Sequence, residues 1–584
     1  MSRSRAGRPP DRHGGLILAG LCLAAFIISL DTTIVNVALP SLVRETGATT
    51  AGLQWVVDAY NLSFAALVLA AGGLSDRLGR KGMLLTGLAV FGLASLAGSF
   101  ATSTAKLIAA RAAMGAGAAM MFPSTLSLLT SVFTGRRERA RAIGLWGATT
   151  GAGIASGPII GGWLLEHFWW GSAFLFLAPV AGVVAAAVAA TVPTSRDPST
   201  PPVDWRGLVL SASGMGLLVL GVIEAPGWGW TSARTIGTLA GGGAVLAAFA
   251  AVEIRTAQPM LEVSLFRNPR FAAASASVAI AFFALQGFIF LMTQYFQAVR
   301  GYAPLSTGVR LLPVAAAVAA AAVVGTRLVV RVGNKVVVAG GLTLYCAALA
   351  WISTSSQATP YAVIAVKGAL LGAAMGLTQA PATEAIMGAV PANKAGIGSA
   401  VNDATRLFGG TLGVAVVGSV AASLYSSRLA ATLPGGLPGP AAAAAHGSVG
   451  GAVTAARALG KAGHAGLADL LDHAGILAFL HGFAGGCIVA SAVAAAGALL
   501  AASSLPARPR VQPDQAPPGC SPAGSCRPPG RGIHATATRI APGQRCPSST
   551  PCSPPVRGKI RSHFAPRTGH TERRQRAHEP PADS

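Results

Sequence analysis

The sequence predicts an all-α polytopic membrane protein, and three observations lead to that prediction. Only 11% of the 584 residues are charged, whereas soluble domains carry about a quarter. Hydrophobic residues make up 52% of the chain, and its mean hydropathy is positive. Apolar runs of about 20 residues, long enough to cross the hydrocarbon core of a bilayer, recur as far as residue 504. A soluble multidomain protein, a collagen and a disordered chain are therefore excluded.

Fourteen apolar stretches are predicted to cross the membrane as helices. The first follows four arginines and is longer than the apolar region of a signal peptide, so we expect an uncleaved span. An even number of spans places both termini on one side of the membrane. The approximate bounds of the spans are 16–39, 51–72, 82–100, 104–131, 140–164, 172–193, 206–226, 235–253, 271–297, 308–330, 335–354, 358–381, 399–424 and 476–503.

The distribution of basic residues predicts which side that is. The net charge of +24 would by itself suggest a nucleic-acid partner. Most of this charge, however, lies in the terminal segments and in loops on the side of the termini, as the positive-inside rule requires of cytoplasmic segments. We therefore expect a cell-membrane protein with both termini in the cytoplasm. Membrane lipid, and not nucleic acid, is the expected partner of the basic segments.

A short internal repeat predicts how the spans are grouped. The pentapeptides RLGRK (77–81) and RVGNK (331–335) follow the second and the tenth span, which indicates a repeat offset by eight spans. Two six-helix bundles with two extra central helices would result. The predicted segments are an N-terminal arm (1–14), an N-terminal bundle (15–193), two linking helices (194–270), a C-terminal bundle (271–504) with an outer loop (426–475), and a disordered basic cytoplasmic tail (505–584).

Three ionisable residues are predicted to lie at one depth in the membrane. Asp31, Asp58 and Arg111 are each seven or eight residues from the outer end of their span, which is about 11 Å at the rise of an α-helix. A lone charge there would cost roughly 2.5–3.5 kcal/mol, so we expect the three to line a hydrated transport path or to form a structural ion pair. Burial favours a neutral carboxyl and a nearby arginine favours a charged one, so a conformational change would bind or release a proton.

The loop between the second and third spans reads GGLSDRLGRK (72–81) and resembles the signature of the major facilitator superfamily. The segments LDTTIVNVALP (30–40), LIAARAAMGAGAA (107–119) and GPIIGG (157–162) are similar to motifs of its fourteen-span drug:proton antiporter branch, the EmrB/QacA type. The resemblance covers about residues 15–425 and, more weakly, the last span. It implies the major facilitator fold, with two six-helix bundles and two extra central helices.

The resemblance also implies roles for particular residues. In the loop, Gly72, Asp76, Arg77, Gly79, Arg80 and Lys81 would form a conformational latch. In the fifth span, Gly153, Gly157, Pro158, Gly161 and Gly162 would let helices pack closely and seal the path against proton leak. An acidic residue for proton or substrate binding is implied at Asp403, where an inner-interface carboxylate paired with Arg406 is an equally good interpretation.

These features predict a proton-coupled multidrug efflux antiporter that exports hydrophobic, cationic compounds by alternating access. We expect a monomer that needs no cofactor or metal, because the proton gradient drives it. Export of an anionic or neutral metabolite or antibiotic is the alternative, and a membrane sensor without transport is a weaker one. An enzyme is not expected, because the spans contain no nucleophile–base pair. Substrate identity, proton stoichiometry and the roles of Lys367 and Glu384 stay open.

Overall fold

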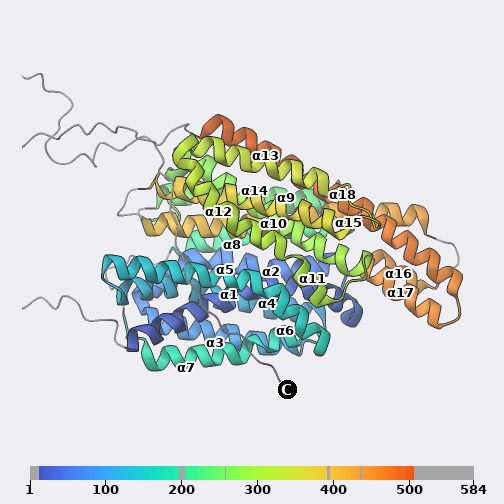
Figure 1. Ribbon diagram of the computed structural model, residues 1–584, viewed down its shortest axis with the longest axis horizontal. Helices are drawn as coiled ribbons and strands as arrows, with labels where there is room; N and C mark the ends of the chain where they lie inside the picture. Colours follow the sequence, from blue (N-terminus) through green and yellow to red (C-terminus); the bar gives the residue numbers. More distant parts are fainter. Residues whose placement is uncertain (1–11, 196–203, 257, 391–394, 434–436, 506–584) are drawn as a thin grey trace, which may run out of the picture. The chain divides into compact units, whose positions relative to one another are not determined.

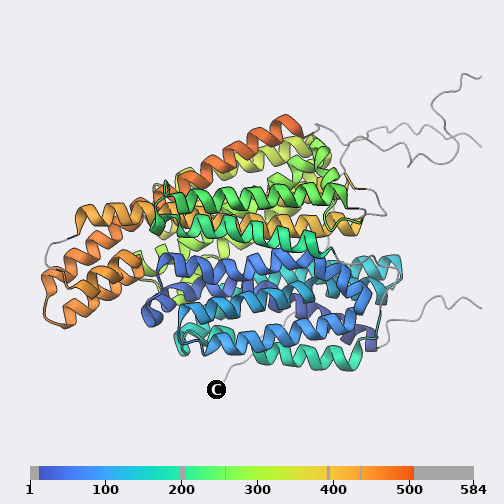
Figure 2. The same ribbon diagram turned by 180° about the vertical axis from the view of Figure 1, so that it is seen from behind.

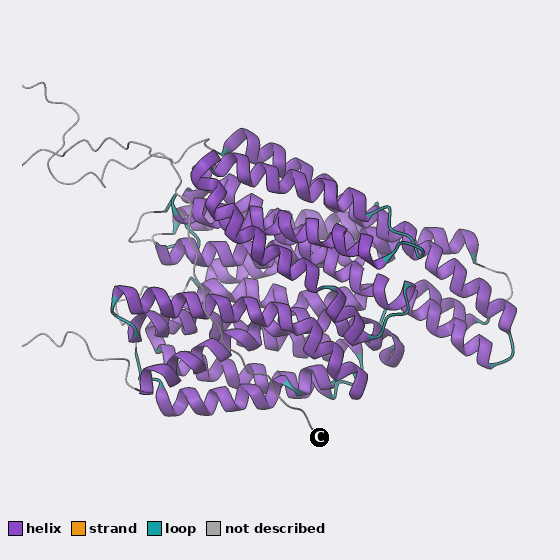
Figure 3. Cartoon of the chain, viewed as in Figure 1, coloured by secondary structure: helices purple, strands orange, loops and turns teal. Residues whose placement is uncertain are grey.

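Every regular element in the described part of the chain is a helix, which confirms the predicted fold class (Figure 3). A computed structural model describes residues 12–195, 204–256, 258–390, 395–433 and 437–505. These residues belong to one compact unit, Met1–Val511. The expectations for most of the arm 1–14 and for the tail 505–584 fall outside the described residues.

The first half of the unit contains seven helices, followed by a pair that links the halves (Figure 1). The sixth predicted span is divided into a short helix, α6, and a longer one, α7. The helices are α1 (Arg12–Thr46), α2 (Thr50–Leu78), α3 (Arg80–Ser99), α4 (Thr104–Val132), α5 (Arg136–His167), α6 (Ser172–Leu175), α7 (Leu177–Thr191), α8 (Trp205–Trp228) and α9 (Ala233–Arg255).

The second half repeats this pattern and adds two short helices in a long connection. The predicted outer loop 426–475 is largely helical, since α15 and α18 extend into it from both sides. The elements are η1 (Val263–Arg267), α10 (Pro269–Gln294), the π-helix η2 (Tyr295–Val299), α11 (Pro304–Arg310), α12 (Leu312–Val332), α13 (Asn334–Ile352), α14 (Tyr361–Met387), α15 (Ala395–Thr432), α16 (Gly439–Gly447), α17 (Val449–Lys461) and α18 (Ala465–Ser504).

Thirteen stretches of the described chain are long and apolar enough to cross a membrane, one fewer than the fourteen predicted. They correspond to every predicted span except the fifth, 140–164, which is the helix α5. This helix begins with four arginines within six residues and continues with seven glycines. Its apolarity is therefore low, although at 32 residues it is long enough to span the bilayer.

Helix pairs in the first half recur in the second half eight spans later. The pairs α1–α5, α2–α4 and α3–α7 correspond to α10–α15, α12–α14 and α13–α18. The glycines of the two pentapeptides also have equivalent places, because Gly79 separates α2 from α3 and Gly333 separates α12 from α13. Both have positive φ, 120° and 87°, which glycine adopts without strain.

The two ends of the helices define two sides of this unit. We call the end where α1 begins and α18 ends the terminal side, and the other end, where α16 and α17 lie, the loop side (Figures 1 and 2). The linking helix α8 packs on α9 and also contacts α2 from the first half and α15 from the second. The two halves therefore meet along α2, α8 and α15 as well as at α5 and α11.

Candidate functional site

A pocket lies between the two halves and takes its lining from both. It has an empty volume of about 810 Å³, which includes open solvent. Its walls are mainly apolar and aromatic, as in sites that bind small organic molecules. The lining residues are Ile28, Ser29, Thr32 and Thr33 of α1; Asn61 and Phe64 of α2; Phe122 of α4; Thr150 and Ile154 of α5; Phe282, Leu285, Gln286 and Ile289 of α10; and Asp403, Arg406, Leu407 and Gly410 of α15.

Contacts between the halves close this pocket on the loop side. The buried side-chain amide of Gln54 in α2 donates hydrogen bonds to Val414 O at 3.0 Å, Ala415 O at 2.8 Å and Ser419 Oγ at 3.2 Å in α15. The Gln297 amide similarly donates to Val37 O at 2.9 Å. Along each of these helices the contacts lie nearer the loop side than the pocket residues do, so the pocket lies on the terminal side of the closure.

The five residues of the predicted packing motif hold α5 against two other helices. A Cβ on Gly153 would lie 2.7 Å from Phe26 O, and one on Gly157 would lie 2.9 Å from Leu30 O, both in α1. Thr33 strengthens this seam by donating its hydroxyl to Ile154 O at 3.1 Å. Larger residues at these positions would push α1 and α5 apart.

The same helix touches the second half with the other part of the motif. A Cβ on Gly161 would lie 2.6 Å from Ile34 Cγ1 in α1, whereas one on Gly162 would lie 2.5 Å from Leu305 Cα at the start of α11. A Cβ on Gly308 of α11 would overlap the backbone at Pro158. The motif therefore places α5 between α1 and α11, at the closed side of the pocket.

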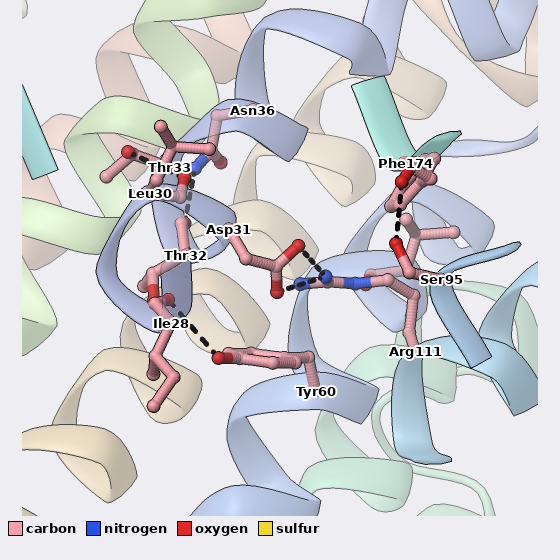
Figure 4. A network of polar contacts seen from close by, with 11 residues as sticks. Ile28, Leu30, Asp31, Thr32, Thr33, Asn36, Tyr60, Ser95, Arg111 and Phe174 are labelled. Atoms are coloured by element: carbon pink, nitrogen blue, oxygen red, sulfur yellow. Dashed lines mark hydrogen bonds and ion pairs between the residues drawn. The ribbon is translucent and has the colours of Figure 1, made fainter. Parts of the chain in front are cut away.

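Asp31 and Arg111, predicted at one depth, form a buried ion pair inside the first half (Figure 4). Arg111 Nη1 donates to Asp31 Oδ1 at 2.8 Å and to Oδ2 at 2.6 Å. The exposed fractions of these side chains are 1% and 0%. Because breaking a fully buried pair leaves an uncompensated charge, the pair is expected to be strongly held in this conformation.

The rest of the Arg111 guanidinium is also engaged. Its Nε donates to Val56 O at 3.0 Å, and its Cζ lies 4.3 Å from the centre of the Tyr60 ring, within cation–π distance. The Tyr60 hydroxyl donates to Ile28 O in α1 at 3.3 Å. Ile28 also lines the pocket, so α1 connects the ion pair on one of its faces with the pocket on another.

Asp58 lies apart from this pair, although all three residues are predicted at the same depth in the membrane. Its side chain is fully buried, and neither carboxylate oxygen has a hydrogen-bond partner among the described residues. Its neighbours on the same helical face, Ala51, Trp55 and Leu62, pack against a small apolar cluster from α8 and α15. An ionised carboxylate is costly there, so this position favours a neutral acid in the present conformation.

Asp403, near the start of α15, is the predicted acid that lines the pocket. Its Oδ1 lies 3.4 Å from Arg406 Nη1, one turn further along α15. The Arg406 guanidinium also lies over the Phe282 ring of α10, 4.7 Å from its centre. The remaining predicted charges, Asp31, Asp58 and Arg111, are not among the lining residues of this pocket.

The predicted latch holds the junction of α2 and α3 against neighbouring helices of the first half. Asp76 Oδ1 accepts hydrogen bonds from Arg80 Nε at 2.6 Å and from Ser127 Oγ of α4 at 3.2 Å. Lys81 Nζ donates to Ala189 O of α7 at 2.8 Å. Gly72 faces α4, where a Cβ would lie 3.8 Å from Pro123 Cβ, while the side chain of Arg77 is exposed.

Lys367 and Glu384, whose roles the sequence leaves open, are not among the residues that line the pocket. Lys367 is buried and donates through Nζ to Ser355 Oγ at 3.0 Å and Thr354 Oγ1 at 3.2 Å, in the connection before its own helix α14. This hydroxyl shell provides polar partners for a cation inside a span. Glu384 is exposed. Among the described residues, no group of three or more metal-ligating side chains is placed to hold a metal ion.

Three functional candidates escaped the sequence reasoning. Gln54 and Gln297 bind the opposite half, and Arg406 adds a positive charge to the pocket. A neutral glutamine within a span carries little sequence signal. The sequence places Arg406 only beside Asp403, because its stacking on Phe282 joins segments that are far apart in the sequence.

Comparison with known proteins extends this description. The family described as Major Facilitator Superfamily matches residues 21–414. The multidrug resistance protein Stp of Mycobacterium tuberculosis is 38% identical over 425 residues, which cover 73% of this chain and 79% of Stp. The multidrug efflux pump LfrA of Mycolicibacterium smegmatis is 34% identical over 495 residues, 84% of this chain and 96% of LfrA.

One solved structure has a similar arrangement of helices. It is the crystal structure of a bacterial homologue of the human lysosomal transporter Spinster in an inward-facing, unoccupied conformation. The TM-score is 0.60 at 16% identity, and the likeness covers 85% of this chain and 98% of that one. At this identity the likeness concerns the fold alone.

Proposed function

Because this chain belongs to the major facilitator superfamily, we propose that it exports hydrophobic, cationic compounds across the cell membrane in exchange for protons. Family membership makes it a multi-pass membrane transporter of small molecules and not an enzyme. The names of Stp and LfrA, which denote multidrug resistance and multidrug efflux, support export of drugs. The basic loops on the terminal side support a cytoplasmic location for both termini.

The observation that carries this proposal is the pocket shared by the two halves. Its aromatic rings and the Asp403 carboxylate are the groups that bind an organic cation. The pocket lies on the terminal side of the Gln54 and Gln297 contacts, so a compound would enter from the cytoplasm in this conformation. Alternating access then requires those contacts to break while a new closure forms on the terminal side.

Proton exchange is the second part of the proposal, and buried acids support it. Asp58 has no hydrogen-bond partner among the described residues, and burying it as a neutral acid costs less free energy than burying it as a carboxylate. Asp31 is paired with Arg111, and α1 links this pair to the pocket wall. A movement of α1 that separates the pair would favour protonation of Asp31, because a buried carboxylate without its partner is unstable.

The energetics allow the exchange. Export against a tenfold concentration ratio needs about 1.4 kcal/mol. One proton exchanged for one monovalent cation moves no net charge, so the pH gradient alone would drive it. A second proton would add about 2.3 kcal/mol for each 100 mV of membrane potential.

The test uses the full chain reconstituted in liposomes that contain a pH-sensitive dye. An imposed pH gradient should drive tetraphenylphosphonium transport, and the added cation should release protons from the lumen. Asp58→Asn should lower this coupled flux, whereas Glu384→Gln, at an exposed acid, is the matched control. A protein that shows no proton flux with any member of a panel of organic cations would contradict the proposal.

One observation favours a second class of substrate. The guanidinium of Arg406 lies in the same pocket and could bind the acidic group of an anionic metabolite. The panel therefore includes 1-naphthalenesulfonate, an aromatic anion. Proton flux with this anion and none with the cations would assign the protein to export of anions.

A further inference from the structure

Arg406 is a pocket charge that the proposed exchange does not use. Asp403 and Arg406 are the two charged side chains among the described residues that line the pocket. The guanidinium has two contacts there, the Asp403 carboxylate at 3.4 Å and the face of the Phe282 ring, 4.7 Å from its centre. A cationic aromatic substrate would need these same two contacts.

We propose that Arg406 is a built-in competitor for the substrate: in the empty pocket it occupies Asp403 and Phe282, and an organic cation binds by displacing it. This inference rests on the proposed function, because it concerns the same pocket and the same class of substrate. It makes Arg406 a specificity-determining residue. Without a substrate, the arginine keeps the Asp403 carboxylate from standing uncompensated beside apolar walls.

The geometry of the pair suits displacement. Arg406 approaches Asp403 through one nitrogen, at a long distance, and the two side chains remain 26% and 21% exposed. A single long contact between partly exposed groups is weaker than a short bidentate one. The buried pair of Arg111 and Asp31, by contrast, has distances of 2.6 and 2.8 Å and exposed fractions of 1% and 0%. The Arg111–Asp31 pair is therefore held more firmly than the Arg406–Asp403 pair of the pocket.

This competition selects among cations. A compound must replace both contacts of the guanidinium, so it needs a positive charge and an aromatic surface that packs on Phe282. Flat or phenyl-rich cations meet this requirement. Small aliphatic ammonium ions replace only the charge contact, and they gain little because Arg406 already neutralises Asp403.

The inference is tested by equilibrium binding of tetraphenylphosphonium to the purified full chain in nanodiscs. Arg406→Gln removes the charge and nearly keeps the length, so binding should tighten by about threefold to tenfold. Arg406→Lys retains a cation that can pair with Asp403 but loses the guanidinium stacking on Phe282, so its binding should lie between those of the parent and Arg406→Gln. In the double variant Asp403→Asn with Arg406→Gln, the gain should disappear, because the carboxylate that was released is gone.

Controls separate this effect from general changes in surface charge or folding. Arg267→Gln removes an exposed arginine outside the pocket and should leave binding unchanged. Arg406→Ala provides a second truncation in case the glutamine variant does not yield monodisperse protein. Tetramethylammonium, an aliphatic cation, should bind weakly to the parent and gain less than tetraphenylphosphonium in Arg406→Gln.

Unchanged or weaker tetraphenylphosphonium binding by both Arg406 truncations would overturn the inference. Loss of 1-naphthalenesulfonate binding in these variants, with binding of the cation unaltered, would also overturn it and make Arg406 an anion site. Failure of the proposed exchange would be detected in a different experiment, as the absence of proton flux in liposomes that contain the parent protein. The binding difference between parent and variant does not depend on that flux.

Discussion

Replacing Asp31 with asparagine tests whether the buried ion pair serves only the fold or also the exchange. The substitution keeps the size of the side chain but leaves the Arg111 charge uncompensated within the first half. Of the two contacts of 2.6 and 2.8 Å, the amide oxygen can keep at most one, as a neutral acceptor, while the bond to Val56 O and the packing on Tyr60 remain. Loss of one partner of a buried pair costs about 3–5 kcal/mol, and the remaining contacts place the expected destabilisation toward the lower figure.

The decisive variant removes both charges. Asp31→Asn combined with Arg111→Gln leaves no unpaired charge, so most of the lost stability should return. If Asp31 exchanges a proton during transport, the double variant should regain stability but not gradient-driven transport. A role confined to the fold predicts that both return together.

Two measurements on the same preparations separate these outcomes. Thermal unfolding of the parent, both single variants and the double variant in nanodiscs gives the order of stability. Uptake of tetraphenylphosphonium into liposomes under a pH gradient gives coupled transport. Full transport by the stable double variant would refute a coupling role for Asp31, and an Asp31→Asn protein as stable as the parent would refute the energetic reasoning about the buried pair.

Two further predictions concern the closed side of the pocket. Gly157→Leu should leave the protein in the membrane but abolish coupled transport in the liposome assay, because its Cβ would lie 2.9 Å from Leu30 O. Gly151 lies on the same helix with open space around it, so Gly151→Leu should transport normally in the same assay. Equal activity of the two variants would count against the seam. Gln54→Leu removes three hydrogen bonds between the halves, each contributing about 0.5–1.5 kcal/mol, and should shift the protein toward opening on the loop side. A cysteine placed at buried Ala415 should then be more accessible from outside the cell. In whole cells it should react with an impermeant maleimide at least about tenfold faster in the Gln54→Leu variant than in the protein that retains Gln54. An unaltered rate would show that these hydrogen bonds do not hold the closure.

Much of the fold follows from the sequence, because span length and apolarity are set by the bilayer. The exception is α5, where glycines that allow close packing replace the aliphatic residues that mark the other spans. The pentapeptides 77–81 and 331–335 also indicated a repeat whose helix pairs recur in the structure. The helices of the fold can therefore be predicted from local sequence, because the length and apolarity of each span depend on its own residues.

The site could be predicted only in part. The rise of a helix gives the depth of a residue, and depth alone brought Asp31 and Arg111 together correctly. Asp58 has the same depth, but Trp55 and Leu62 of its helical face pack toward α8 and α15, because the surroundings of a side chain depend on which helices lie next to its own. The pairing of Arg406 with Phe282 depends on how the two helices α10 and α15 pack, and no short motif records that arrangement.

The linking pair α8–α9 has a consequence for how compounds reach the pocket. Since α8 touches both α2 and α15, it lies beside one seam between the halves. Any compound dissolved in the bilayer meets a protein wall on that flank in the present conformation. Under the proposed alternating access, α8 would have to move with one half and slide along the other, so that the inserted pair would keep lipid away from the substrate path in both conformations.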